Sequence, residues 1–165
     1  AKKSLRPLDV IVRELFTPEV GSESGVSSRF YARAPLMGGL RAAVDLTAIR
    51  GLMRGAEPQA HCCSVWLGQG GNITPFHYDL CHGFLVGVLG RKTFTLVAPD
   101  DFRDMYARPE RPELSRIDFE AMRASDAEEL RKHPRFANAS TMTIDVREGD
   151  VLYTPPFWWH HVETS

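Results

Sequence analysis

The sequence predicts a mainly β domain of the α+β class, with an antiparallel sandwich preceded by short helices. At 165 residues the chain has the length of one domain. Its later part contains seven short apolar segments separated by turn residues, the pattern of a sandwich or barrel. These expected strands cover residues 60–69, 74–79, 84–89, 92–97, 141–146, 150–154 and 158–163.

The N-terminal part has helical periodicity. Pro7 suits a first helical position, and apolar side chains recur every three or four residues over 7–16. A second helix is expected over 40–54. We therefore expect an N-terminal helical support segment over 1–58 and the β core over 59–165, within one domain overall.

A charge-dense insertion separates the fourth and fifth expected strands, over residues 100–137. Ser125 and Glu128 have capping-box spacing, so we expect a helix over 126–132. The sequence leaves two interpretations of the insertion open, a substrate-facing lid or a solvated surface loop.

The composition excludes several classes of protein. Hydrophobic residues make up 43% and charged residues 25%, as in ordinary globular proteins rather than disordered or fibrous ones. The net charge of −1 supplies no excess of cations for a phosphate backbone, so nucleic acid is a disfavoured partner. The longest uncharged apolar run, 83–90, is too short to span a bilayer. Three cysteines, two of them adjacent (Cys62 and Cys63), favour a reducing, cytoplasmic setting.

One expected strand carries a pair of metal-ligand side chains. His77 and Asp79 are two residues apart, so on a strand they project from the same face. An imidazole and a carboxylate are two thirds of the 2-His-1-carboxylate triad that holds Fe(II) with open coordination positions.

A third ligand has to come from a distant strand. The segment 158–163 brings two adjacent histidines, His160 and His161, after the turn at Pro155 and Pro156. Adjacent strand residues face opposite ways, so only one of the two histidines can join His77 and Asp79. The alternation alone does not say which.

Several motifs together resemble the JmjC/cupin-8 oxygenase family, and within it most resemble asparaginyl hydroxylases. The similarity extends from about residue 30 to the last residue. The motifs, in chain order, are Thr74-Pro75-Phe76-His77-Tyr78-Asp79, then Gly90-Arg91-Lys92, then Gly149-Asp150-Val151-Leu152-Tyr153 and Trp158-Trp159-His160-His161.

The resemblance implies a fold and a chemistry. Members of this family fold as a double-stranded β-helix, or jelly roll, and use Fe(II), 2-oxoglutarate and O2 to hydroxylate or demethylate substrates that are commonly proteins. By the resemblance His77, Asp79 and His160 are the iron ligands and the catalytic centre, and His161 points outward. Lys92, Thr74 and Tyr31 match residues that bind 2-oxoglutarate.

The sequence departs from the family pattern in two places. Many relatives have an asparagine six residues after the first histidine, where this chain has Gly83, and His82 is a candidate substitute. Relatives also continue with a further core strand after the segment that corresponds to 158–163. We therefore expect a free sheet edge beside that segment and a possible homo-oligomer.

Two functions follow as hypotheses. The first is an Fe(II)- and 2-oxoglutarate-dependent hydroxylase acting on a protein or peptide side chain. The alternative is a non-catalytic metal-binding cupin, a pseudo-enzyme that binds a small molecule. Lys92 and Thr74 favour the first, because a cupin that only binds metal needs no anchor for a dicarboxylate.

Overall fold

The computed structural model describes residues 31–36, 38–43, 47–53 and 63–165. The chain forms two compact units, Ala1–Asn72 and Ile73–Ser165. The expected helix over 7–16 lies outside the described residues. Among the described helices none is long and apolar enough to span a membrane.

The described part of the first unit is a two-stranded antiparallel ribbon with two short helices. Strand β1 (Tyr31–Pro35) pairs with β2 (Ser64–Gly68), with Tyr31 opposite Gly68. The single helix expected over 40–54 is wrong, since α2 (Gly38–Ala43) and α3 (Thr47–Leu52) replace it. Val44 and Asp45, between the two, have low helix propensity.

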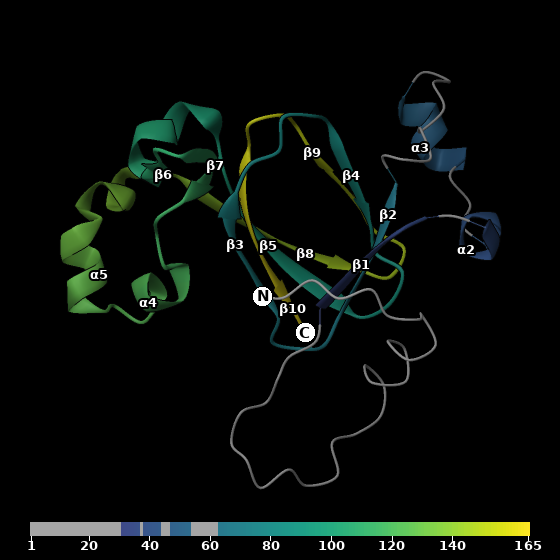
Figure 1. Cartoon of the computed structure of the whole chain (residues 1–165), viewed down its shortest axis with the longest axis horizontal. Coiled ribbons are helices and arrows are strands. Elements are labelled where there is room, and N and C mark those ends of the chain that lie inside the picture. The colour runs from purple at the N-terminus through teal and green to yellow at the C-terminus, as the bar shows by residue number, and fades with distance from the viewer. Residues whose placement is uncertain (1–30, 37, 44–46, 54–62) are drawn as a thin grey trace, which may run out of the picture. The chain divides into compact units, whose positions relative to one another are not determined.

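The second unit is an antiparallel sandwich, as the sequence predicts (Figure 1). Its larger sheet has the strand order β6-β7-β3-β10-β5-β8, and β4 pairs with β9 in a smaller sheet. The strands of the larger sheet are β3 (Ile73–His77), β5 (Arg91–Val97), β6 (Ala107–Arg108), β7 (Arg111–Ser115), β8 (Thr141–Arg147) and β10 (Trp159–Thr164). Those of the smaller sheet are β4 (Gly83–Val86) and β9 (Val151–Thr154).

A close backbone approach joins the ends of the two sheets. Gly87 and Asp150 share a hydrogen bond of 2.9 Å, and Gly149 N donates to Gly87 O at 2.9 Å. A Cβ at Gly87 would collide with the carbonyl group of Arg147, and Gly149 has a φ of +86°. Both positions therefore require glycine.

The strand β10 lies in the interior of the larger sheet. It pairs with β3 on one side and β5 on the other, so that His160 is opposite both His77 and Leu96. The prediction of a free sheet edge beside 158–163 is therefore wrong, because β3, the first strand of this unit, pairs with β10 there. The correction removes the structural reason for self-association through this strand.

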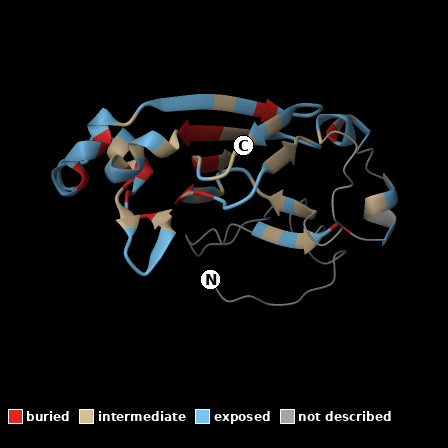
Figure 2. Cartoon of the chain, turned by 90° about the horizontal axis from the view of Figure 1, so that it is seen from above, coloured by how far each residue is buried: buried red, intermediate tan, exposed pale blue. Residues whose placement is uncertain are grey.

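Buried side chains form two cores, one on each face of the larger sheet. Figure 2 shows buried stretches along the central strands of the chain. Phe94, Leu96, Val146 and Val162 pack between the two sheets, with Leu85 and Leu152 of the smaller sheet against them. The other core lies on the opposite face and contains Phe76, Tyr78, Val97, Met105, Ile117, Phe119, Phe136 and Trp159.

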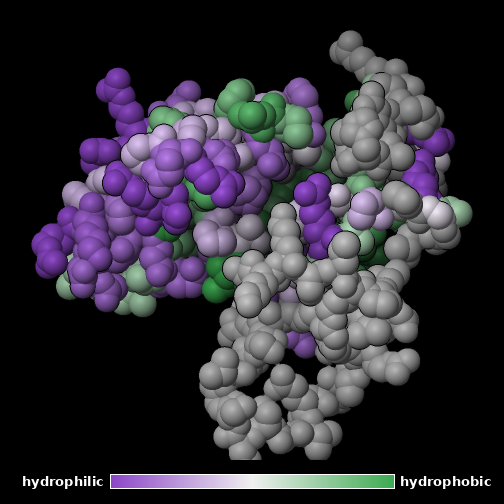
Figure 3. Space-filling view, in the orientation of Figure 1, coloured by the Kyte–Doolittle hydropathy of each residue, from purple (hydrophilic) through white to green (hydrophobic). Residues whose placement is uncertain are grey.

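The insertion over 100–137 builds that second core, so it is not merely a solvated surface loop, and its role as a substrate-facing lid stays a prediction. Met105, Ile117, Phe119 and Phe136 all come from it, and β7 extends the larger sheet with Leu114 opposite His77. Hydrophilic residues predominate on the face of it that Figure 3 shows. Its helical segments are η2 (Pro99–Met105), α4 (Phe119–Arg123), α5 (Ala127–Lys132) and η3 (Pro134–Asn138).

The helix α5 confirms the one expected over 126–132, but its capping differs from the prediction. Asp126 is the N-cap, and its side chain accepts a hydrogen bond from Glu129 N at 2.9 Å. Ser125 has a φ of +58°, so it belongs to the turn between α4 and α5. The capping box of Ser125 and Glu128 is therefore wrong by one residue.

Candidate metal centre

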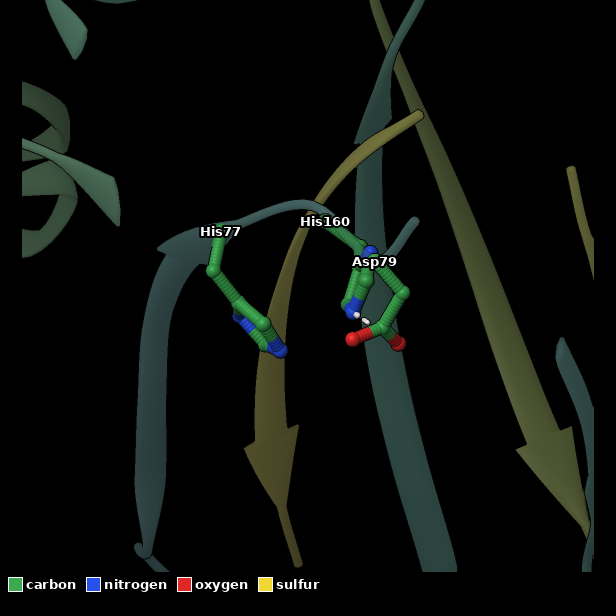
Figure 4. Close-up of side chains that lie close together, drawn as sticks. All are labelled: His77, Asp79 and His160. Atoms are coloured by element: carbon green, nitrogen blue, oxygen red, sulfur yellow. Dashed lines mark ion pairs between the residues drawn. The ribbon is translucent and has the colours of Figure 1, made fainter. Parts of the chain in front are cut away.

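Three side chains, from β3, the loop after it and β10, converge. His77 ends β3, Asp79 follows two residues later, and His160 lies in β10 opposite His77. The imidazole centroids are 4.1 Å apart, and His160 Nε2 is 3.9 Å from Asp79 Oδ2. One ligand atom of each residue lies within 4.8 Å of the others, and the side chains point toward one another (Figure 4).

Asp79 reaches this point from a loop rather than from the strand that the sequence predicts over 74–79. Its backbone oxygen accepts a hydrogen bond of 2.8 Å from Phe157 N, and Tyr78 N donates to Glu113 O at 3.0 Å. Phe157 adopts a φ of +66°, which is unusual for a bulky residue. The turn before β10 and strand β7 thus hold the backbone of this loop on two sides.

Backbone carbonyls orient both imidazoles. His77 Nδ1 lies 2.9 Å from Pro75 O, and His160 Nδ1 lies 3.0 Å from Trp158 O. A carbonyl only accepts, so each neutral ring carries its proton on Nδ1 and has a lone pair on Nε2. This second contact is the one that metal-ligating histidines ordinarily make.

Burial keeps His160 neutral. Desolvation, helped by the charge of neighbouring His77, lowers the pKa of His160 to about 4, against smaller opposing effects of the Trp158 carbonyl and Asp79. Asp79 is largely exposed. Two imidazoles, one of them held neutral, and a carboxylate, with ligand atoms within 4.8 Å of one another, are the donor set of a facial Fe(II) site.

His161 faces away from this centre, as the resemblance implies, but it does not point outward. Its side chain is 1% exposed and packs against the rings of Phe76 and Phe119, at centroid distances of 5.4 and 5.0 Å. Burial lowers its pKa, against the opposing effect of Glu120 and Glu163. Trp159, on the same face, is fully buried.

Lys92 and Thr74 flank β10 further along the sheet face that carries His160. Lys92 is opposite Thr164 in the register of β5 with β10, and Thr74 is opposite Val162 in that of β3 with β10. Residues directly opposite one another project from the same face of a sheet. Lys92 Nζ donates to Thr164 Oγ1 at 3.1 Å, and burial lowers the pKa of Lys92.

Three further residues are singled out by the sequence. Tyr31 belongs to the first unit, where its ring is 5.7 Å from that of Trp66, so its role stays a prediction. His82 is exposed, and its Nδ1 lies 2.6 Å from the hydroxyl group of Tyr153. Gly83 is opposite Thr154 in the smaller sheet.

The sequence reasoning missed a second cluster of ligand-type side chains. Glu120, His161 and Glu163 also have ligand atoms within 4.8 Å of one another. His161 and Glu163 are two residues apart, like His77 and Asp79, and this spacing could have indicated the second cluster from the sequence. Glu120 comes from the insertion, and no spacing could have identified it.

Comparisons with known proteins agree with this geometry. A family model described as a cupin-like domain matches residues 31–165. Jumonji C domain-containing protein 5 of Drosophila melanogaster is 34% identical over 110 residues, 66% of this chain and 26% of that protein. Lysine-specific demethylase 8 of Danio rerio is 32% identical over 105 residues, 61% of this chain and 24% of that protein.

A third relative has a different name. The tRNA wybutosine-synthesizing protein 5 of Mus musculus is 34% identical over 86 residues, 52% of this chain and 25% of that protein. The chain therefore spans about a quarter of the length of these curated relatives. The particular likeness to asparaginyl hydroxylases stays a prediction. With the sandwich and the convergent His77, Asp79 and His160 in place, the match over 31–165 shows that the chain belongs to the JmjC/cupin-like oxygenase family.

Proposed function

We propose that this chain is the catalytic domain of an Fe(II)- and 2-oxoglutarate-dependent hydroxylase that acts on a protein or peptide side chain. The observation that carries the proposal is the convergence of His77, Asp79 and His160, with both Nε2 lone pairs left available by the Nδ1 contacts. In this proposal those three residues hold the metal and are the catalytic centre.

The metal and its co-substrates supply the oxidising chemistry. When bound, Fe(II) with 2-oxoglutarate and O2 provides the equivalents that insert one oxygen atom into an aliphatic C–H bond, with succinate and CO2 as products. The protein's part is to hold its three ligands on one side, to position the co-substrate and to exclude water.

Lys92 is the residue we assign to the far carboxylate of 2-oxoglutarate. It is partly buried on the sheet face that carries His160, and a buried carboxylate needs a cation or several hydrogen-bond donors. Thr74 adds a hydroxyl donor from the other side of β10. Phe94, Leu96 and Val162 make the wall of that face apolar.

A polypeptide is the substrate class that we favour. One relative is named a lysine-specific demethylase and another a tRNA wybutosine-synthesizing protein, so relatives differ in what they act on. The net charge of −1 gives this chain no general attraction for RNA, which supports a polypeptide.

Binding of 2-oxoglutarate to the Mn²⁺-loaded chain tests the proposal by calorimetry. We expect Lys92→Ala to weaken this binding at least 100-fold, because an unpaired buried charge costs roughly 3–5 kcal/mol. Mn²⁺ affinity should be unchanged in Lys92→Ala and lost in His77→Ala. Lys132→Ala, which removes an exposed lysine paired with Glu128, is the matched control.

Turnover separates the hydroxylase from the alternative function. The Fe(II)-loaded chain should form succinate in proportion to a mass gain of one oxygen in members of a peptide library. A chain that binds Mn²⁺ but not 2-oxoglutarate would instead be a non-catalytic metal-binding cupin, and the proposal would be withdrawn.

A further inference from the structure

The face of β10 opposite the candidate metal centre carries a second set of ligand-type side chains, here called the His161 cluster: Glu120, His161 and Glu163. His161 and Glu163 come from β10, and Glu120 comes from α4 of the insertion. His161 Nε2 lies 2.8 Å from Glu120 Oε1, and His161 Nδ1 lies 3.9 Å from Glu163 Oε1. The three groups offer an imidazole and two carboxylates within 4.8 Å.

The buried atoms of this cluster lack hydrogen bonds. In the part of the chain that the structure describes, five buried side-chain nitrogen or oxygen atoms have no hydrogen-bond partner, and four are in the His161 cluster. They are both ring nitrogens of His161 and the Oε1 atoms of the two glutamates. Close ion-pair contacts are present nonetheless, because His161 Nε2 lies 2.8 Å from Glu120 Oε1 and Glu163 Oε1 lies 2.9 Å from the Arg123 guanidinium group. His161 Nδ1, in a side chain that is 1% exposed, has no hydrogen-bond partner and lies 3.9 Å from Glu163 Oε1, and a buried ring nitrogen in this position calls for an ion or a water.

Arg123 is the one cation beside the cluster among the described residues. Its guanidinium group lies 2.9 Å from Glu163 Oε1 and 3.8 Å from Glu120 Oε1, over the ring of Phe119. It therefore balances one of two carboxylate charges. Its side chain is about half exposed, so it can turn out to water without crossing a packed core.

We propose that Glu120, His161 and Glu163 form a second divalent-cation site, and that Arg123 occupies the place of the cation when no metal is bound. Imidazole and carboxylate are together a donor set suited to Zn²⁺, with a fourth position left for water. The rings of Phe76 and Phe119 fix the plane of the imidazole, and the partly exposed glutamates open the site to solvent.

The two sites are independent in their side chains. His160 and His161 are neighbours, yet they project from opposite faces of β10, and the two sites share no side chain. A chain without the first site can therefore test the second, and the result does not depend on the proposed oxygenase activity.

Zn²⁺ titration of the full chain carrying His77→Ala and Asp79→Ala is the direct experiment. We expect one equivalent of Zn²⁺ to bind, measured by calorimetry and by metal analysis after desalting. In that background Glu120→Gln or Glu163→Gln should weaken binding at least tenfold. Arg123→Gln should tighten binding severalfold, because it removes the competing cation. Glu128→Gln, on the exposed side of α5, is the matched control and should change nothing.

Two results would overturn the proposal. One is the absence of Zn²⁺ binding to the His77→Ala, Asp79→Ala chain when its near-ultraviolet circular dichroism shows intact packing. The other is binding that neither glutamate variant weakens, which would place the ion elsewhere. The glutamate variants are preferred to His161→Ala because the His161 ring fills space in the core, and its removal also creates a cavity.

Discussion

His160 is a buried imidazole with two ionisable side chains beside it. His77 is opposite it in β3, and Asp79 lies 3.9 Å from its Nε2 atom. Burial outweighs the attraction of the carboxylate, so the pKa of His160 falls to about 4. The metal-free protein therefore has a neutral His160 ring at neutral pH. Protonation of this ring at low pH would disfavour both folding and metal binding at the candidate site.

Metal-free protein should lose stability as the pH falls from 6.5 to 4. Over this interval the unfolded chain binds a proton at His160 that the folded chain does not, so the free energy of unfolding rises with pH. At about 1.4 kcal/mol per pKa unit, the loss by pH 4 is on the order of 3 kcal/mol. Urea unfolding at both pH values measures it.

The comparison protein for this experiment is His160→Asn, which keeps a polar side chain but cannot titrate. Other groups titrate in both proteins, so the difference between the two pH dependences isolates His160. Equal losses in the two proteins would show that His160 does not carry the effect.

Sequence reasoning identified His77 and Asp79 from their spacing, but it left His160 and His161 open until the family resemblance was used. The ambiguity is physical: alternation says that two neighbours face opposite ways, not which face holds the metal. The strand register supports His160, because His160 is opposite His77. Asp79 lies beside these two histidines from a loop, so spacing on an ideal strand predicted its proximity for a partly wrong reason.

At the scale of elements, seven expected strands are present because each has apolar side chains to bury. The sequence missed β6 and β7, which have two and five residues and are rich in arginine. Antiparallel pairing within the insertion and onto β3 holds these strands, and no hydrophobic pattern indicates it. The single helix expected over 40–54 failed because periodicity does not locate interruptions.

The turn between α4 and α5 offers a matched pair of substitutions. Asp126→Ala removes the N-cap hydrogen bond to Glu129 N and should lower the free energy of unfolding by about 1 kcal/mol. Ser125→Gly should raise it by up to about 1 kcal/mol, because glycine adopts the φ of +58° without strain. Urea unfolding of both variants measures the changes. If Ser125→Gly lowered the free energy of unfolding more than Asp126→Ala did, Ser125 would be restored as the cap.

At the scale of the whole second unit, the two faces of the larger sheet each contribute side chains to a different core. The core between the sheets includes Val162 on the face that carries His160, and the insertion completes the other core around Trp159 and His161. The insertion is thus part of the fold. Its removal would expose the aromatic side chains of β3 and β10 at the back of the metal centre.

Phe119→Ala tests this role of the insertion. Phe119 is 8% exposed and contacts Phe76 edge-on at 4.9 Å, so we expect a loss of about 3–5 kcal/mol in the free energy of unfolding. Leu130→Ala, at an insertion residue that is 43% exposed, should cost less than about 1 kcal/mol. If the insertion were only a lid, Phe119→Ala would slow turnover and leave urea unfolding unchanged.

The alternation of β10 has a consequence for how this sequence can evolve. Deleting one residue near Trp158 would exchange the two faces of the strand. His161 would take the place of His160, but His160 would replace Trp159 in the aromatic core and Glu163 would replace Val162 between the sheets. No compensating substitution at a single position repairs both errors. We therefore expect length changes among descendants of this chain to accumulate in the tip of the β6–β7 hairpin, at residues 109 and 110, and to be absent between Pro155 and Glu163.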